Sequence, residues 1–123
     1  MEDFKRWIEQ AKRDIKIAEY NCNGDFFESS IFYCQQSVEK SLKAILIKNE
    51  GKLLKIHDLV ILGRKTNLPN EFLKIISELN SAYTKARYGI SINKIPAELF
   101  SKTETLDFLN LAKEILKWAE NQM

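Results

Sequence analysis

Residues 25–48 read DFFESSIFYCQQSVEKSLKAILIK, and this stretch carries the strongest evidence about the fold. Its apolar side chains recur every three or four residues, which predicts one buried face of a long helix. The stripe consists of Phe27, Ile31, Cys34, Val38, Leu42 and Ile45. Beside it lies a strip of small residues, Ser30, Ser37, Ser41 and Ala44, where a second helix can approach closely. A helix of this extent is about 36 Å long, which only an elongated bundle accommodates.

The preceding segment, 3–21, predicts another amphipathic helix. Its apolar residues again recur at spacings of four and three: Phe4, Ile8, Ala11, Ile15, Ala18 and Cys22. Between the two helices, Gly24 is suited to a left-handed stop. Asp25 is expected to cap the second helix, with Glu28 three residues later in the position of a capping box.

The second half of the chain predicts three more helices. A short one is expected from about His57 or Asp58 to Lys65, and a longer one begins near Pro69, a residue suited to a first helical turn. The apolar stripe of the longer helix is Phe72, Ile76, Leu79, Tyr83 and Ala86. A connector over 88–101 follows, and Ser101 with Glu104 predicts a capped start for the last helix.

The last helix has a broad apolar face, made by Phe108, Leu109, Leu111, Ala112, Ile115, Leu116, Trp118 and Ala119. This exceeds what one bundle face needs, and the connector adds Ile90, Ile92 and Ile95. We therefore expect a homodimer. Short connections between long amphipathic helices favour antiparallel neighbours. The predicted fold is all-α: one domain over residues 1–123, an up-down antiparallel bundle of four main helices plus one short helix.

Composition narrows the functional classes. The 123 residues have a net charge of only +2, which argues against a generic electrostatic nucleic-acid binder. Charge is uneven, however: residues 37–65 have seven Lys or Arg against three acids, and residues 98–123 have five acids against three lysines. Two cysteines without metal-site spacing indicate a reducing, cytoplasmic location and no structural metal. No apolar run approaches the 18 residues or so of a membrane span.

Three groups of residues could contact a ligand. Tyr83 and Arg87 lie four apart on one helix face, where a ring and a guanidinium suit a base and a phosphate; alternatively, they are a core tyrosine and a helix-end charge. His57 stands at a helix start, where an anion is favoured, or it only bonds across the junction. Lys40 and Lys43 could hold a phosphate, although Glu39 and Lys43 also match an ordinary i,i+4 pair.

The string Gln35-Gln36-Ser37-Val38-Glu39-Lys40-Ser41-Leu42-Lys43-Ala44 resembles the hallmark of the HEPN (higher eukaryotes and prokaryotes nucleotide-binding) domain family. Features elsewhere agree in order: Trp7, Ala11 and Asp14; Gly24 to Phe27; His57-Asp58-Leu59; and Tyr83 with Arg87-Tyr88. The resemblance implies a dimerising helical bundle, often paired with a minimal nucleotidyltransferase encoded beside it. Some members of this kind are regarded as nucleotide-binding modules. Other branches are ribonucleases, often the toxin of a toxin–antitoxin pair.

The ribonuclease branches use an arginine, then four to six residues, then a histidine. The only histidine here is His57, and the corresponding upstream positions hold Glu50, Gly51 and Lys52. Lysine does not reproduce the bidentate grip of a guanidinium on phosphate. The predicted function is therefore a binding module without a catalytic residue or cofactor, in which Arg87, Tyr83, His57, Lys40 and Lys43 contact nucleotide. The alternative is a ribonuclease toxin with a displaced or degenerate active site.

Overall fold

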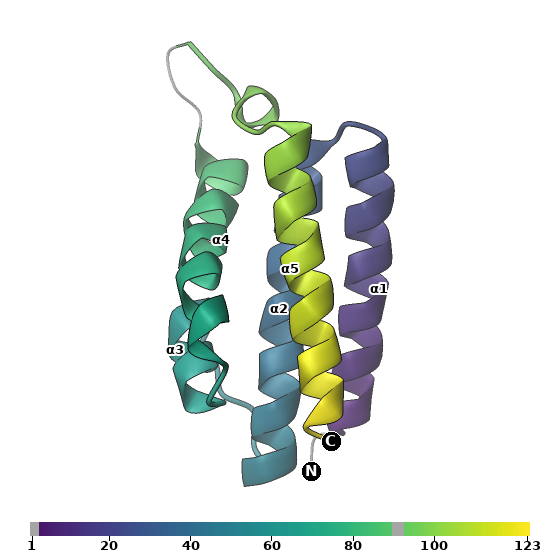
Figure 1. The fold of residues 1–123 in the computed structure, drawn as a ribbon, viewed down its shortest axis with the longest axis vertical. Coiled ribbons are helices and arrows are strands. Elements are labelled where there is room, and N and C mark those ends of the chain that lie inside the picture. Colours follow the sequence, from purple (N-terminus) through teal and green to yellow (C-terminus); the bar gives the residue numbers. More distant parts are fainter. Residues whose placement is uncertain (1–2, 90–92) are drawn as a thin grey trace.

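The computed structural model describes residues 3–89 and 93–123, and these form a bundle of helices (Figure 1). The elements are α1 (Phe4–Asn23), α2 (Phe27–Glu50), α3 (Leu59–Lys65), α4 (Asn70–Tyr88), the 3₁₀ turn η1 (Pro96–Glu98) and α5 (Lys102–Asn121). The four long helices run alternately up and down, and short α3 lies between α2 and α4 in the chain (Figure 1). The predicted fold class is confirmed.

Helix α2 is the centre of the bundle, because it packs against α1, α3, α4 and α5. Its apolar stripe is buried, from Ile31 through Ile45, as the sequence pattern predicts. The strip of small residues faces α1: the hydroxyl of Ser30 donates to the carbonyl of Ala18 at 2.7 Å, and that of Ser37 donates to the carbonyl of Ala11 at 2.9 Å. These bonds explain how two long helices can lie so close together.

The turn between α1 and α2 differs from the prediction. Gly24 has a φ of −90°, and the left-handed residue is Asp25, with a φ of 64°. Aspartate tolerates this region better than most residues. Asp25 therefore does not cap α2; the cap position is Phe26, with no side-chain hydrogen bond. Gly24 has a different role, because a Cβ there would lie 3.1 Å from the ring of Phe26.

Two other helices start close to the predicted positions. The Ser101 hydroxyl accepts from the backbone N–H of Glu104 at 3.1 Å and begins α5. Asp58 caps α3 by accepting from the N–H groups of Val60 and Ile61. Both caps satisfy donors that a helix start otherwise leaves without partners.

The broad apolar face of α5 is used within the chain. Both halves of it are buried, from Phe108 to Ala119, and only Trp118 is half-buried. The reason is that α5 contacts α1, α2 and α4, so it needs apolar surface on more than one side. The inference of excess surface on α5 was therefore wrong. Ile95 is exposed, whereas Ile90 and Ile92 lie outside the described residues.

Cys22 and Cys34 are free thiols buried in the core. Burial raises the pKa of the Cys34 thiol to about 12. Across the described part of the chain, no helix combines the length and apolar character needed to cross a membrane.

Candidate functional site

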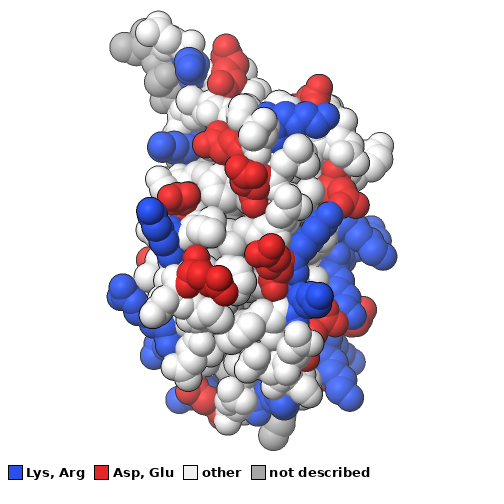
Figure 2. Space-filling view, viewed as in Figure 1, with Lys and Arg blue, Asp and Glu red and all other residues white. Residues whose placement is uncertain are grey.

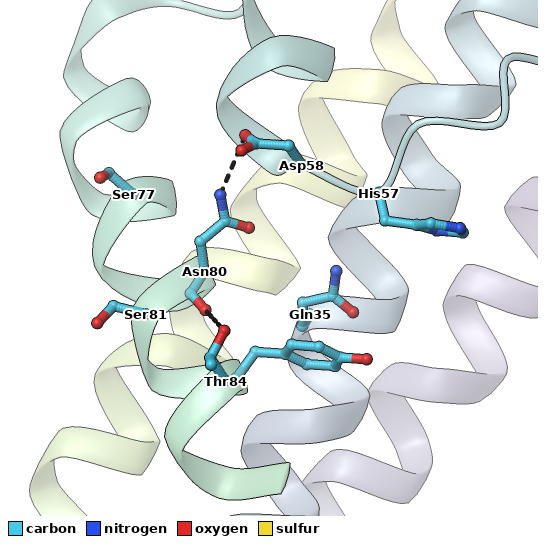
Figure 3. Close-up of a pocket in the computed structure, with 8 residues that line it drawn as sticks. Gln35, His57, Asp58, Ser77, Asn80, Ser81 and Thr84 are labelled. Atoms are coloured by element: carbon cyan, nitrogen blue, oxygen red, sulfur yellow. Dashed lines mark hydrogen bonds between the residues drawn. The ribbon is translucent and has the colours of Figure 1, made fainter. Parts of the chain in front are cut away.

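A polar hollow of about 440 Å³ opens where α2, the start of α3 and α4 meet (Figure 3). Amide and hydroxyl side chains make up most of its wall. The lining residues are Gln35, His57, Asp58, Ser77, Asn80, Ser81, Tyr83 and Thr84. Such a wall offers donors and acceptors for a polar ligand, and Asp58 is the one acidic residue among those that line it.

One side of the hollow is held by a junction between α3 and α4. The carboxylate of Asp58 accepts from the Asn80 amide at 3.2 Å (Figure 3). The side-chain carbonyl of Asn80 accepts from the backbone N–H of Leu59, also at 3.2 Å. Asp58 also takes the N–H groups of Val60 and Ile61. The first three N–H groups of α3 are thus already bonded. The idea that this helix start receives a phosphate is not supported, because its donors are taken.

His57 lies on the other side and is mostly exposed, with 79% of its side chain accessible. Its Nδ1 is 3.1 Å from Oε2 of Glu39, a buried carboxylate on α2. The same carboxylate accepts from Gln35 at 3.1 Å and from Lys43 at 3.0 Å. Glu39 therefore positions both His57 and Gln35 at the edge of the hollow.

The two candidate lysines of α2 are engaged in ion pairs. The Nζ of Lys40 lies 2.6 Å from Oδ2 of Asp14, whose side chain is only 2% exposed, and Gln10 donates to the other oxygen of Asp14 at 3.0 Å. Lys43 is buried against Glu39, the pairing that its spacing predicts. Neither lysine lines the polar hollow.

Tyr83 and Arg87 meet as the spacing predicts. Arg87 Nη1 donates to the Tyr83 hydroxyl at 3.0 Å, which raises the pKa of Arg87. The Tyr83 ring stacks on Phe32 with centroids 5.6 Å apart, and the guanidinium lies 5.5 Å from the centre of the Phe32 ring. Tyr83 is half-buried and lines the hollow, so it links the guanidinium to the polar wall.

Sequence reasoning missed much of this wall. Ser77, Asn80, Ser81 and Thr84 recur at helical spacing and form a polar stripe on α4, a signal that was present in the sequence. Phe32 was also missed, because it lies outside the main stripe of α2. Within residues 3–89 and 93–123, no three His, Cys, Asp or Glu side chains gather as metal ligands.

The chain matches the HEPN domain family over residues 4–122. The crystal structure of ST0689, an archaeal HEPN homologue, superposes with a TM-score of 0.82; it is 31% identical and the match covers 99% of this chain and 98% of that one. TT1696 from Thermus thermophilus has the same fold, with a TM-score of 0.90, 22% identity and full coverage of both chains. No curated protein matches. This chain belongs to the HEPN domain family.

Proposed function

We propose that this HEPN domain is a non-catalytic module that binds a nucleotide across the polar hollow. The observation that carries the proposal is that Arg87 bonds to Tyr83, and Tyr83 belongs to the wall of amides and hydroxyls. Arg87 uses one of its five N–H groups on Tyr83, which leaves donors for a phosphate. The hydroxyls of α4 are suited to a ribose, and the amides of Gln35 and Asn80 each have a second N–H for a base edge, beyond the one bonded to Glu39 or Asp58.

His57 contacts the nucleotide from the opposite edge in this proposal. Lys40 and Lys43 stabilise the fold and do not contact the nucleotide in this proposal, because their ammonium groups pair with the buried carboxylates of Asp14 and Glu39. With one guanidinium and few directional contacts, we expect weak binding. Two buried thiols suit a reducing compartment, which supports a cytoplasmic location.

The test is calorimetric titration with ATP of the wild type and of Arg87→Ala. Loss of charged hydrogen bonds to phosphate should weaken binding by about tenfold to a hundredfold. The control is Arg13→Ala, which removes an arginine of α1 that does not line the hollow, and it should leave the affinity for ATP unchanged. Equal affinity of Arg87→Ala and the wild type would refute the site.

Family membership also supports a wider proposal, in which the module forms a homodimer and acts with a minimal nucleotidyltransferase in a toxin–antitoxin-like system. If a small nucleotidyltransferase is encoded beside this gene, the two chains should copurify after coexpression. If the two chains do not associate, the proposal of a nucleotidyltransferase partner is wrong.

A second candidate function, a ribonuclease with a displaced site, is favoured by the contact of His57 with Glu39. A carboxylate that accepts from Nδ1 leaves Nε2 available as a proton acceptor. RNA cleavage by the purified chain that is abolished in His57→Ala would establish this alternative. The non-catalytic proposal expects no cleavage by either protein.

A further inference from the structure

A groove runs between α4 and α5. Neither Lys40 nor Lys43 lines it, and Ser81 is the one residue it has in common with the polar hollow among the described residues. Helix α4 packs mainly on α2 and touches α5 only slightly. Two adjoining hollows, of about 410 and 260 Å³, result along the seam. They share Glu78 from α4 and Glu104 and Phe108 from α5, so they form one continuous groove.

The floor of this groove is apolar. Phe108 and Phe100 line it, and both side chains otherwise belong to the core. Ile75 on α4 also lines it and remains 38% exposed. An aliphatic side chain from a partner would remove this surface from water.

The rim of the groove is acidic. Glu78, Glu104 and Asp107 stand along it, and Lys85 is the one cation among the described residues that line it. None of the three carboxylates forms an ion pair with another described residue. Figure 2 shows acidic side chains along the middle of this face, with most of the Lys and Arg toward its sides.

We propose that this groove docks a basic amphipathic helix of a partner protein. Charge complementarity identifies the occupant: three carboxylates repel a phosphate backbone and attract Lys or Arg. The groove lies between two antiparallel helices, so a third helix can lie along it with its apolar face on Ile75 and Phe108. Ile75 to Ala82 spans about two helical turns, so a partner helix of two to three turns fills it. The proposal does not depend on nucleotide binding.

The probe is a fluorescent amphipathic peptide of leucine and lysine, about 14 residues long, with one apolar face. Fluorescence anisotropy at low salt should show saturable binding to the full chain. A scrambled peptide of the same composition has no continuous apolar face and should bind at least about tenfold more weakly. Absence of saturable binding, or equal binding of the scrambled peptide, would overturn the proposal.

Two variants and a matched control locate the site. Glu78→Lys with Asp107→Lys should weaken peptide binding at least about tenfold. The control, Glu9→Lys with Glu50→Lys, makes the same change in net charge on α1 and at the end of α2, and should weaken it much less. Similar losses in both variants would mean that only net charge matters, which contradicts docking in the groove.

The third variant, Ile75→Gln, keeps the charge and removes an aliphatic contact, so affinity should fall about threefold or more. Unchanged affinity would show that the peptide is held by charge alone, which contradicts the apolar floor. Sedimentation of each variant tests whether a second copy of the chain fills the groove instead. If the wild type dimerises and Glu78→Lys with Asp107→Lys is monomeric, the groove is a dimer interface and the proposal is wrong. Circular dichroism of each variant checks that it is folded.

Discussion

Replacement of Lys40 by methionine tests whether this lysine belongs to the structure or to a ligand site. Methionine keeps an apolar stem of similar length but removes the ammonium that lies 2.6 Å from Asp14. Asp14 would then be a carboxylate with a 2% exposed side chain and no ion-pair partner among the described residues, although Gln10 still donates to one of its oxygens. A buried charge without its counter-charge is strongly unfavourable.

The expected cost follows from the geometry of the pair. Removal of one member of a fully buried ion pair costs about 3–5 kcal/mol. Lys40 is 21% exposed, so water reaches the site and reduces the penalty to about 2–4 kcal/mol. In a domain of this size that lowers the melting temperature by roughly 8–16 °C. Asp14→Asn combined with Lys40→Met removes both charges and should recover at least about half of the loss.

The assay is guanidinium denaturation followed by circular dichroism, together with ATP titration of the folded protein. A loss below about 1 kcal/mol for Lys40→Met would refute the argument that the pair stabilises the contact of α1 with α2. Undiminished stability of Lys40→Met combined with a clear loss of ATP affinity would instead place Lys40 in the ligand site. Failure of the double variant to recover stability would show that packing, not charge, dominates.

Four other predictions are open to direct measurement. Titration of the denatured, unreduced protein should find two free thiols per chain; in the native protein at pH 8 Cys34 should react very slowly, because its pKa of about 12 leaves little thiolate. Since this pKa is raised on folding, the thiol's contribution to stability is intact below about pH 9 and is lost as the pH rises toward 12, which denaturation at increasing pH can check. Asp58→Ala should cost about 1–2 kcal/mol of folding stability through loss of the α3 cap, with Asp107→Ala as an exposed comparison that changes little. Light scattering at micromolar concentration should give twice the 14.3 kDa chain mass, and a monomer mass would refute the homodimer.

Periodicity alone predicted the helices well, because the stripes of α1, α2 and α5 have to be buried wherever their neighbours lie. It could not say which neighbours cover them. The face of α5 that suggested a second copy is covered by α1, α2 and α4 of the same chain. The turn at Gly24 was mispredicted for a local reason: aspartate can also adopt a left-handed conformation, and the ring of Phe26 occupies the space beside the glycine.

The candidate site was predicted only where its residues share one helix. Tyr83 and Arg87 are four residues apart, so helical geometry brings them together without any knowledge of the tertiary structure. The contact of His57 with Glu39 joins residues 18 apart, and that of Asp58 with Asn80 joins residues 22 apart. Such pairs depend on how α2, α3 and α4 pack, which the spacing of residues does not contain.

The signature string of α2 has a consequence for how HEPN domains are compared. Its polar residues Gln35, Glu39 and Lys43 are buried, and they bond to one another and to His57. Buried polar groups destabilise the folded state unless they are hydrogen-bonded, so such a network constrains the packing of the helices whatever the domain binds. The string therefore identifies the fold and the position of His57. The wall of the hollow comes mainly from α4, so differences in ligand among similar domains should follow the residues aligned with Ser77 to Arg87 more closely than the string itself.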